Sequence, residues 1–392
     1  MKKTNSDSIF TKITLLLIST LTVMAGATIA PSLPAMGKYF SDVPNVDYLV
    51  RLALTLPALL IALGAPLVGV IIDRLGRKPL LIVALILYGF AGSSGLILDS
   101  LNLILISRVG LGISVAGIMT TATTLIADYY VGDSRANFLG LQAGFMGLGG
   151  VIFLSLGGIL ADINWRLPFA IYLFSLVLVG LALLFLPEPE RNLATQNSNS
   201  SNVETSQNFP LKLVLITYGL GVISQIVFYL IPVQLPFYLQ QLFAANASQS
   251  GLAIAVATLT SAIVSLAYRQ IKARLSFLAI YSMAFLNLGI GYLLISLGNV
   301  YPVVILGLGI AGAGLGLIMP NMNLCLVSIS PDAIRGRILS GVTTSIFLGQ
   351  FLSPLVSQPL SNIVGLGNTY GLAGGVMLIL MLITFISLKL GQ

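Results

Sequence analysis

The sequence contains no histidine and a single cysteine, Cys325, and only 8% of its 392 residues are charged. One thiol cannot build a disulfide framework, and without histidine it leaves no plausible ligand set for zinc or an iron cluster. The phosphate-binding pattern GxxxxGKS is also missing, which argues against a function driven by ATP hydrolysis in this chain. We therefore expect neither an enzyme with catalytic residues nor a bound cofactor or metal.

The composition indicates a membrane protein. Hydrophobic residues make up 57% of the chain, and the charged fraction lies far below the ~25% of a soluble domain. Twelve apolar segments are each long enough to cross a bilayer as an α-helix, at ~20 residues per crossing. They run near residues 13–35, 48–72, 79–97, 101–128, 136–161, 167–186, 211–239, 249–271, 276–297, 301–327, 337–362 and 367–390. We expect an all-α integral membrane protein in contact with the lipid bilayer.

The distribution of lysine and arginine predicts the orientation. With the N-terminus in the cytoplasm, Lys38, Arg51 and Arg166 fall outside, Arg108 lies within a segment, and all the other basic residues fall inside. This pattern follows the positive-inside rule. The net charge of +7 therefore reflects topology, and we expect no nucleic-acid partner. The prediction is a multi-pass protein of the cell inner (plasma) membrane with both termini in the cytoplasm.

A polar tract divides the chain into two halves. Residues 187–210 contain few apolar side chains and a run of Gln, Asn and Ser, so we expect them to form a flexible cytoplasmic linker without a core. The linker separates an N-terminal bundle of six helices, residues 1–186, from a C-terminal bundle, residues 211–392. Asp133 and Arg135 recur as Asp332 and Arg335 in the second half, as parallel repeats would.

The loop between the second and third segments carries the most informative motif. Gly69 and Asp73 lie four residues apart and share one face of a helix end. A glycine there lets a neighbouring backbone approach, and an acid can meet the positive end of another helix. The full motif is Gly69, Asp73, Arg74, Gly76, Arg77 and Lys78. Gly76 supplies the turn, and the spacing resembles the signature between the second and third helices of major facilitator superfamily transporters.

This resemblance covers the whole chain and implies twelve transmembrane helices in two pseudo-symmetric bundles of six, the major facilitator fold. In the superfamily, an acid at the place of Asp128 pairs with the arginine at the place of Arg77. The acid at the place of Asp73 meets the N-terminal end of the eleventh helix, near Arg335. The resemblance therefore implies a cytoplasmic latch between the halves that breaks when the protein opens inward.

Arg108 is the one charge well inside an apolar segment. An intramembrane ion is costly and is functional by default. An arginine four residues before Gly112 resembles the superfamily's fourth-helix motif, which implies a role in substrate or proton handling at the cavity. The structural alternative is that Arg108 binds backbone carbonyls and joins helices.

Uncharged polar residues near the middle of the membrane are candidates for a solute pocket. The superfamily places the first, fourth, seventh and tenth helices around a central cavity. Amides, hydroxyls and phenols there suit a neutral or weakly polar organic solute, although each alone can equally join two helices. The candidates are Thr121, Thr124, Gln142, Gln225, Tyr229, Asn321 and Gln350.

The resemblance implies a secondary active transporter that moves a small organic solute by alternating access. The chain is most similar to bacterial twelve-helix drug and arabinose-efflux permeases, for which residues 30–34 (APSLP) are typical. Proton-coupled efflux of drugs or metabolites by a monomer is the first hypothesis, with a proton gradient as the energy source. Because no acid lies at the midplane, coupling would have to use Asp47 or Asp128. A sugar or glycoside permease, working in either direction, and a transport-dead receptor or scaffold are the alternatives.

Overall fold

The computed structural model describes residues 8–189, 210–331 and 334–390. Within these ranges the regular structure is entirely helical, and twelve stretches of helix are long and apolar enough to cross a membrane. They lie close to the twelve predicted segments. The predicted all-α membrane fold is confirmed.

The N-terminal spans comprise α1 (Ile9–Ala27) with η2 (Ala30–Ser32) and α2 (Leu33–Tyr39), α3 (Val46–Leu75), α4 (Arg77–Ser93) with η3 (Ser94–Leu96), α5 (Leu101–Tyr129), α6 (Gly132–Ile163), and η4 (Leu167–Leu173) with α7 (Phe174–Phe185). The C-terminal spans are α8 (Leu211–Phe243), α9 (Ala247–Lys272), α10 (Phe277–Leu297), α11 (Tyr301–Ile329), α12 (Arg335–Val364) and α13 (Leu366–Leu390).

Two turns in the N-terminal half set the directions of its helices. The segment predicted as residues 13–35 is not one straight helix, because α1 ends at Ala27 and the 3₁₀ turn η2 leads into α2. Pro31 lies at the start of this turn, where the missing amide hydrogen of proline costs least. Between α3 and α4, Gly76 has φ +94°, a conformation that favours glycine. Gly76 thus supplies the predicted turn.

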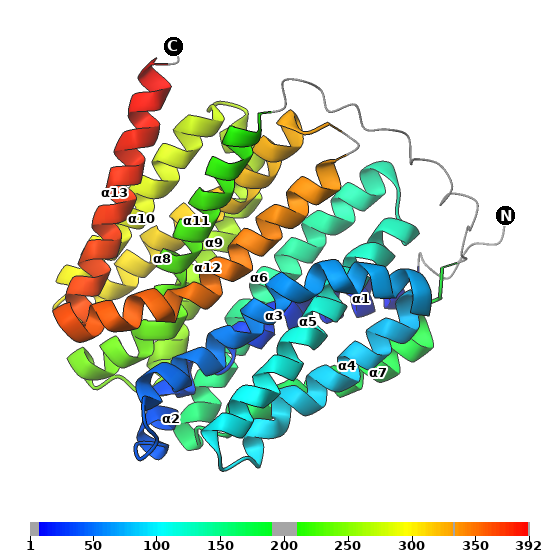
Figure 1. Ribbon diagram of the computed structural model, residues 1–392, viewed down its shortest axis with the longest axis horizontal. Coiled ribbons are helices and arrows are strands. Elements are labelled where there is room, and N and C mark those ends of the chain that lie inside the picture. Colours follow the sequence, from blue (N-terminus) through cyan, green and yellow to red (C-terminus); the bar gives the residue numbers. More distant parts are fainter. Residues whose placement is uncertain (1–7, 190–209, 332–333, 391–392) are drawn as a thin grey trace.

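The helices form two bundles that meet along two seams. Helices α1 to α7 pack on one another, as do α8 to α13 (Figure 1). Across the boundary, α6 packs on α9 and α3 packs on α12. We call the end of the molecule where α7 stops and α8 begins the linker end, and the opposite end the far end. Figure 1 shows α3 and α12 diverging toward the linker end.

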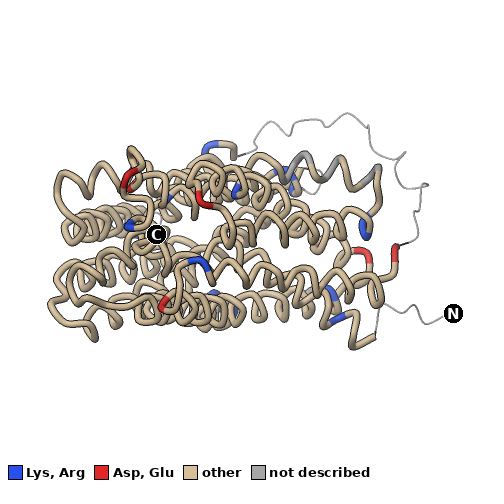
Figure 2. The backbone as a smooth tube through the Cα atoms, turned by 90° about the horizontal axis from the view of Figure 1, so that it is seen from below, with Lys and Arg blue, Asp and Glu red and all other residues tan. Residues whose placement is uncertain are grey.

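Large apolar side chains cover the outside of both bundles. Val83, Leu184 and Ile386 are 61%, 77% and 54% exposed. Monomeric soluble proteins rarely present such extended apolar surface to water. Figure 2 shows that charged positions are sparse along the chain. The exterior is suited to contact with lipid.

Candidate functional site

At the linker end, the turn between α3 and α4 is held against the end of α5. Arg77 Nε donates a hydrogen bond to Asp128 Oδ2 at 3.1 Å, and the two side chains are 22% and 28% exposed. The pair expected from the sequence is therefore present. A partly exposed ion pair contributes only ~0–1 kcal/mol, so this contact orients the turn more than it stabilises the fold.

Glu188 completes this cluster, and it was not predicted from the sequence as a site residue. Its two carboxylate oxygens accept hydrogen bonds from the backbone amides of Arg77 at 2.8 Å and Lys78 at 2.6 Å. These are unpaired amides of the first turn of α4, where a negative charge is favourable. A Cβ on Gly76 would lie 2.8 Å from Glu188 Oε1. Glu188 lies about 110 residues from its partners, so no local pattern predicts the contact.

Replacing Glu188 with alanine is expected to lower the thermal stability of the purified protein by a few degrees. The first turn of α4 would lose a charged acceptor for two amides, which is worth ~1 kcal/mol at a helix N-terminus. Glu188→Gln retains one acceptor oxygen and should lie between wild type and Glu188→Ala. The change is measured by heating the protein to a series of temperatures and determining the folded fraction that remains by size-exclusion chromatography. Equal stability of all three proteins would contradict a capping role.

The rest of the predicted latch is only partly described. The side chains of Gly69, Asp73 and Arg74 lie outside the described residues. Arg335 is the first residue of α12, and its Nη2 donates to the carbonyl of Ser330 at 3.4 Å. The contact of Asp73 with the start of α12 therefore stays a prediction.

Arg108 lies inside the N-terminal bundle and not in a cavity. Its side chain is fully buried, and Nη2 donates to the carbonyls of Gly92 at 2.7 Å and Ala91 at 3.2 Å. The guanidinium also lies over the rings of Phe169 and Tyr172, 5.0 and 5.3 Å from their centres. This is the structural alternative left open by the sequence, because the arginine satisfies the carbonyls at the end of α4. The cavity position expected for Arg108 is not observed.

Gly112, one turn after Arg108, permits close packing of α5 on α3. A Cβ at this position would lie 2.7 Å from the carbonyl oxygen of Pro57 and 2.7 Å from Cβ of Leu60. A larger residue would push these helices apart. The motif residues Arg108 and Gly112 therefore both hold the N-terminal bundle together in this structure.

Replacing Arg108 with alanine is expected to destabilise the protein by about 3 kcal/mol, because two buried carbonyls lose a charged donor and a cavity remains. Arg108→Lys should recover part of this loss. The measurement is the midpoint of thermal unfolding in detergent, together with the affinity of the folded fraction for any transported solute. A variant that unfolds normally but fails to bind would instead support a direct role for Arg108 in solute handling.

Three of the predicted pocket residues lie on α8 and α12 of the C-terminal half. Gln350 Nε2 lies 3.5 Å from Gln225 Oε1, and Gln225 Nε2 lies 4.0 Å from the sulfur of Met319. The Tyr229 hydroxyl reaches the other half, since a Cβ on Gly26 of α1 would lie 2.7 Å from it. Gln225, Gln350 and Tyr229 thus lie on C-terminal helices near the boundary between the halves.

Three of the other candidates form hydrogen bonds to neighbouring helices or to their own backbone. Gln142 Nε2 donates to Ser19 Oγ at 2.8 Å, joining α6 to α1. The amide of Asn321 is fully buried, accepts from the Tyr268 hydroxyl at 3.0 Å and donates to the carbonyl of Phe277. Thr124 donates to the carbonyl of its own helix at residue 120. Thr121 is fully buried, and its hydroxyl has no hydrogen-bond partner among the described residues. The contacts of Gln142 and Asn321 match the helix-joining role that the sequence left open as an alternative.

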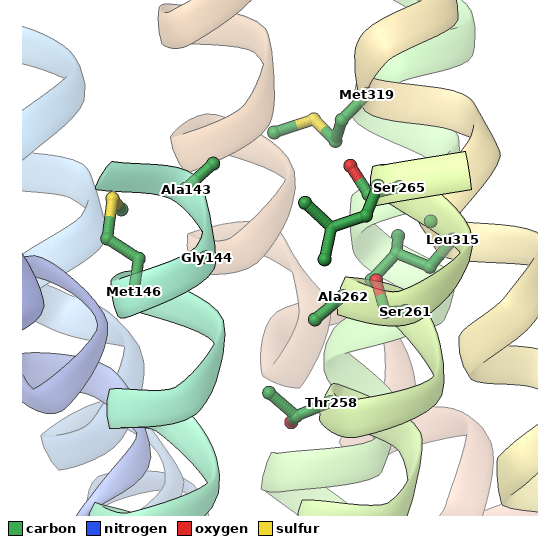
Figure 3. Close-up of a pocket in the computed structure, with 11 residues that line it drawn as sticks. Ala143, Gly144, Met146, Thr258, Ser261, Ala262, Ser265, Leu315 and Met319 are labelled. Carbon is green, nitrogen blue, oxygen red and sulfur yellow. The ribbon is translucent and has the colours of Figure 1, made fainter. Parts of the chain in front are cut away.

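A cavity of about 310 Å³ lies between α6, α9 and α11, and Met319, which contacts Gln225, is one of its lining residues. Figure 3 shows α6 on one side, with α9 and α11 on the other. None of the seven predicted pocket residues lines it. The lining residues are Ala143, Gly144, Met146, Thr258, Ser261, Ala262, Ser265, Leu266, Leu315, Gly316 and Met319. Short side chains on the facing surfaces of α6 and α9 leave this space. A sequence alone does not show which small residues of two distant helices face each other.

The seam between α6 and α9 changes along its length. Toward the far end the backbones touch: a Cβ on Gly158 would lie 2.7 Å from the carbonyl oxygen of Ala247, and one on Gly251 would lie 2.5 Å from that of Leu154. Toward the linker end, a Cβ on Gly144 would meet no atom within 4 Å. The seam is therefore closed at the far end and open at the linker end, with the cavity at the start of the opening.

At the far end, Arg51 of α3 joins the two halves. Its Nε donates to Gln234 Oε1 of α8 at 2.8 Å, and its guanidinium lies 3.8 Å from the ring centre of Phe237. Arg51 is 3% and Gln234 0% exposed. Gln234 Nε2 in turn donates to Ser357 Oγ and Gln358 Oε1 of α12, at 3.1 and 3.0 Å. The sequence placed Arg51 among the outer basic residues and gave no sign of this buried network.

Asp162 provides a second polar contact between the halves at the far end. It lies near the end of α6, and its carboxylate accepts from the backbone amides of Ala247 at 2.7 Å and Ser248 at 3.1 Å, and from the Ser248 hydroxyl. These groups form the first turn of α9, whose unpaired amides favour an anion. Arg51 and Asp162 thus close the same end of the molecule on two different helix pairs.

Comparisons with known proteins agree with this architecture. Residues 15–267 and 217–391 match the family model of the Major Facilitator Superfamily. A stretch of 133 residues is 35% identical to Multidrug resistance protein 1 of Bacillus subtilis (strain 168), covering 34% of each chain. The chain is 27% identical to a Putative proline/betaine transporter of Staphylococcus aureus (strain COL), over 90% of this chain and 82% of that one.

Among solved structures, the crystal structure of D-xylose-proton symporter superposes with a TM-score of 0.78 at 16% identity, covering 95% of this chain and 96% of that chain. The family match spans both halves, as the resemblance of the motif in residues 69–78 predicted. The chain belongs to the Major Facilitator Superfamily and is a transporter, not an enzyme.

Proposed function

We propose that this transporter moves a small organic solute across the inner (plasma) membrane by alternating access, with proton-coupled efflux of drugs or metabolites as the main hypothesis. The observation that carries the proposal is the asymmetry of the α6 and α9 seam. Its far end is closed by backbone contact and by Asp162, and its linker end opens beside a cavity. A packed interface with two discrete arrangements can expose such a cavity to one side at a time.

The expected orientation of the protein supports export as the direction of transport. The positive-inside pattern of lysine and arginine supports a cytoplasmic location of the linker end. The cavity then faces the cytoplasm in the state described here, which suits loading of a solute for export. Similarity to a protein named for multidrug resistance favours the same direction. A proton carrier would have to lie near a helix end, and Asp47, whose Oδ1 lies 3.6 Å from Arg51 Nη1, and Asp128 are the candidates.

The linker-end cluster would form the opposite gate. Glu188 and Asp128 hold the start of α4 and Arg77 in place. In the state open to the far end, the turn between α3 and α4 would then meet the start of α12, with Asp73 facing its unpaired amides. Breaking the far-end contacts of Arg51 and Asp162 would accompany this closure.

A permease for sugars or glycosides is the second candidate. The favouring observation is that the cavity lining contains hydroxyl groups on α9 and no acidic or basic residue. Neutral solutes with several hydroxyl groups need partners of this kind and no counterion.

Flux measurements in proteoliposomes distinguish the two candidates. The panel contains labelled sugars, glycosides, lipophilic cations and neutral dyes, with and without an imposed proton gradient. Gradient-dependent extrusion of dyes or cations would support proton-coupled efflux. Flux selective for sugars and independent of the gradient would support the permease and contradict the efflux proposal. Absence of flux for every compound would contradict both candidates in favour of a receptor or scaffold.

A further inference from the structure

We propose that the cavity between α6 and α9 receives its solute sideways from the half of the bilayer at the linker end, and that this solute is an uncharged amphiphile dissolved in the membrane. The inference rests on the transport function proposed above and specifies its substrate class and its route of entry.

The rim of the cavity reaches the lipid-facing surface of α9. Along this helix, Leu259, Ile263 and Leu266 are 40%, 56% and 66% exposed. Their spacing of three and four residues places them on one stripe, as expected for a helix face that contacts lipid. Leu266 belongs to this stripe and also lines the cavity. A solute in the bilayer can therefore reach the cavity past Leu266 without crossing the aqueous phase.

On its other side the cavity is lined by Ala143, Gly144 and Met146 of α6. Ala143 is exposed and Gly144 has free space around it, and both line the cavity. The lipid-facing side chains of α6, Leu141 and Leu148, are 49% and 57% exposed and do not line it. Figure 3 shows Ala143 across the gap from α9. The opening is thus flanked by the two lipid-facing stripes, one on each helix.

The lining selects against charge. The cavity residues include no Asp, Glu, Lys or Arg, and an ion without a counter-charge is expensive in a low-dielectric site. Thr258, Ser261 and Ser265 lie at helical spacing on one side of α9, where their hydroxyls can bind ether, carbonyl or hydroxyl groups. Met319 faces them with a flexible, polarizable side chain that adapts to different shapes. These features together suit an amphiphile with a few neutral polar groups.

Quenching of a cavity-attached dye tests the route independently of transport. In a Cys325→Ala background, Ala143→Cys is labelled with bimane in nanodiscs. Leu148→Cys on the lipid-facing stripe of the same helix is the control for lipid contact, and Val131→Cys in the α5–α6 turn is the control for water. We expect lipids with brominated chains to quench the dye at position 143 at least half as strongly as at position 148. Quenching at 143 by aqueous iodide with none by brominated lipid would overturn lateral entry, and flux could still proceed.

Binding of matched probes tests the solute class. The probes are N-phenyl-1-naphthylamine, a neutral dye that dissolves in membranes, and tetraphenylphosphonium, a lipophilic cation. We expect the neutral dye to bind wild-type protein in nanodiscs, and Leu266→Lys to weaken its binding about 10-fold, which corresponds to ~1.4 kcal/mol. Ile263→Lys, one turn earlier on the same stripe but outside the cavity, should bind as wild type does. Binding of the cation in preference to the neutral dye, or equal loss in both lysine variants, would overturn the inference.

Discussion

Replacing Arg51 with alanine is expected to open the far end of the transporter. The variant would lose the charged donor to Gln234 and leave a buried amide oxygen without its partner, a cost of ~1–3 kcal/mol. A cost of this size changes the ratio of two conformations about 5- to 150-fold. Hydrogen–deuterium exchange of peptides covering residues 230–243 should therefore rise strongly in Arg51→Ala.

Asp47 provides a matched control for this prediction. It forms an ion pair with Arg51 at 3.6 Å, but its side chain is 69% exposed. Such an exposed pair one helical turn apart contributes only ~0.3–0.5 kcal/mol. Asp47→Ala should leave exchange at the far end almost unchanged. If both variants behave like wild type, Arg51 does not hold the far end closed.

Replacing Gly158 with valine is expected to lower the rate of transport at least about 10-fold, while the protein still inserts in the membrane. Its Cβ would lie 2.7 Å from the carbonyl oxygen of Ala247 and 2.9 Å from Cα of Ser248. Both are backbone atoms, so relief requires α6 and α9 to separate, and this also breaks the contact of Asp162 with α9. A free-energy cost of ~1.4 kcal/mol is enough to shift a conformational equilibrium tenfold. Initial rates in proteoliposomes measure the effect.

The control for Gly158 is Gly375→Val on α13. A Cβ on Gly375 would meet no atom within 4 Å, so the same substitution should leave the initial rate close to that of wild type. Equal rates for Gly158→Val and wild type would show that close approach of α6 and α9 is not needed for the transport cycle.

Hydrophobicity and charge predicted the helices well. A membrane helix must be long and apolar, and lysine and arginine residues concentrate in the loops beside it. The exception within the first span arises at Pro31, where a local turn interrupts an apolar stretch that hydropathy alone cannot divide. The pair of Arg77 and Asp128 was also predictable, because both residues lie in or beside a recognisable motif.

Contacts between distant helices were not predictable in the same way. The position of Arg108 within an apolar segment indicated a buried charge. Its partners are backbone carbonyls of α4, and because every residue has such a carbonyl, the sequence does not identify them. Arg51 lies near the end of an apolar segment, where basic residues are common, so its position does not indicate that it binds Gln234 in the other half. The cavity depends on small residues of α6 and α9 facing each other, whereas sequence reasoning selected conspicuous polar residues such as Gln142 and Asn321, which join helices instead.

Alternating access is tested most directly by measuring one distance at each end of the same protein. In the Cys325→Ala background, spin labels at Val131→Cys and Arg274→Cys report the linker end, and labels at Ile97→Cys and Val300→Cys report the far end. The distances are measured by pulsed electron paramagnetic resonance spectroscopy in proteins with and without Arg51→Ala. We predict that the variant shortens the linker-end distance and lengthens the far-end distance. A change at the far end with no opposite change at the linker end would contradict coupled alternation of the two gates.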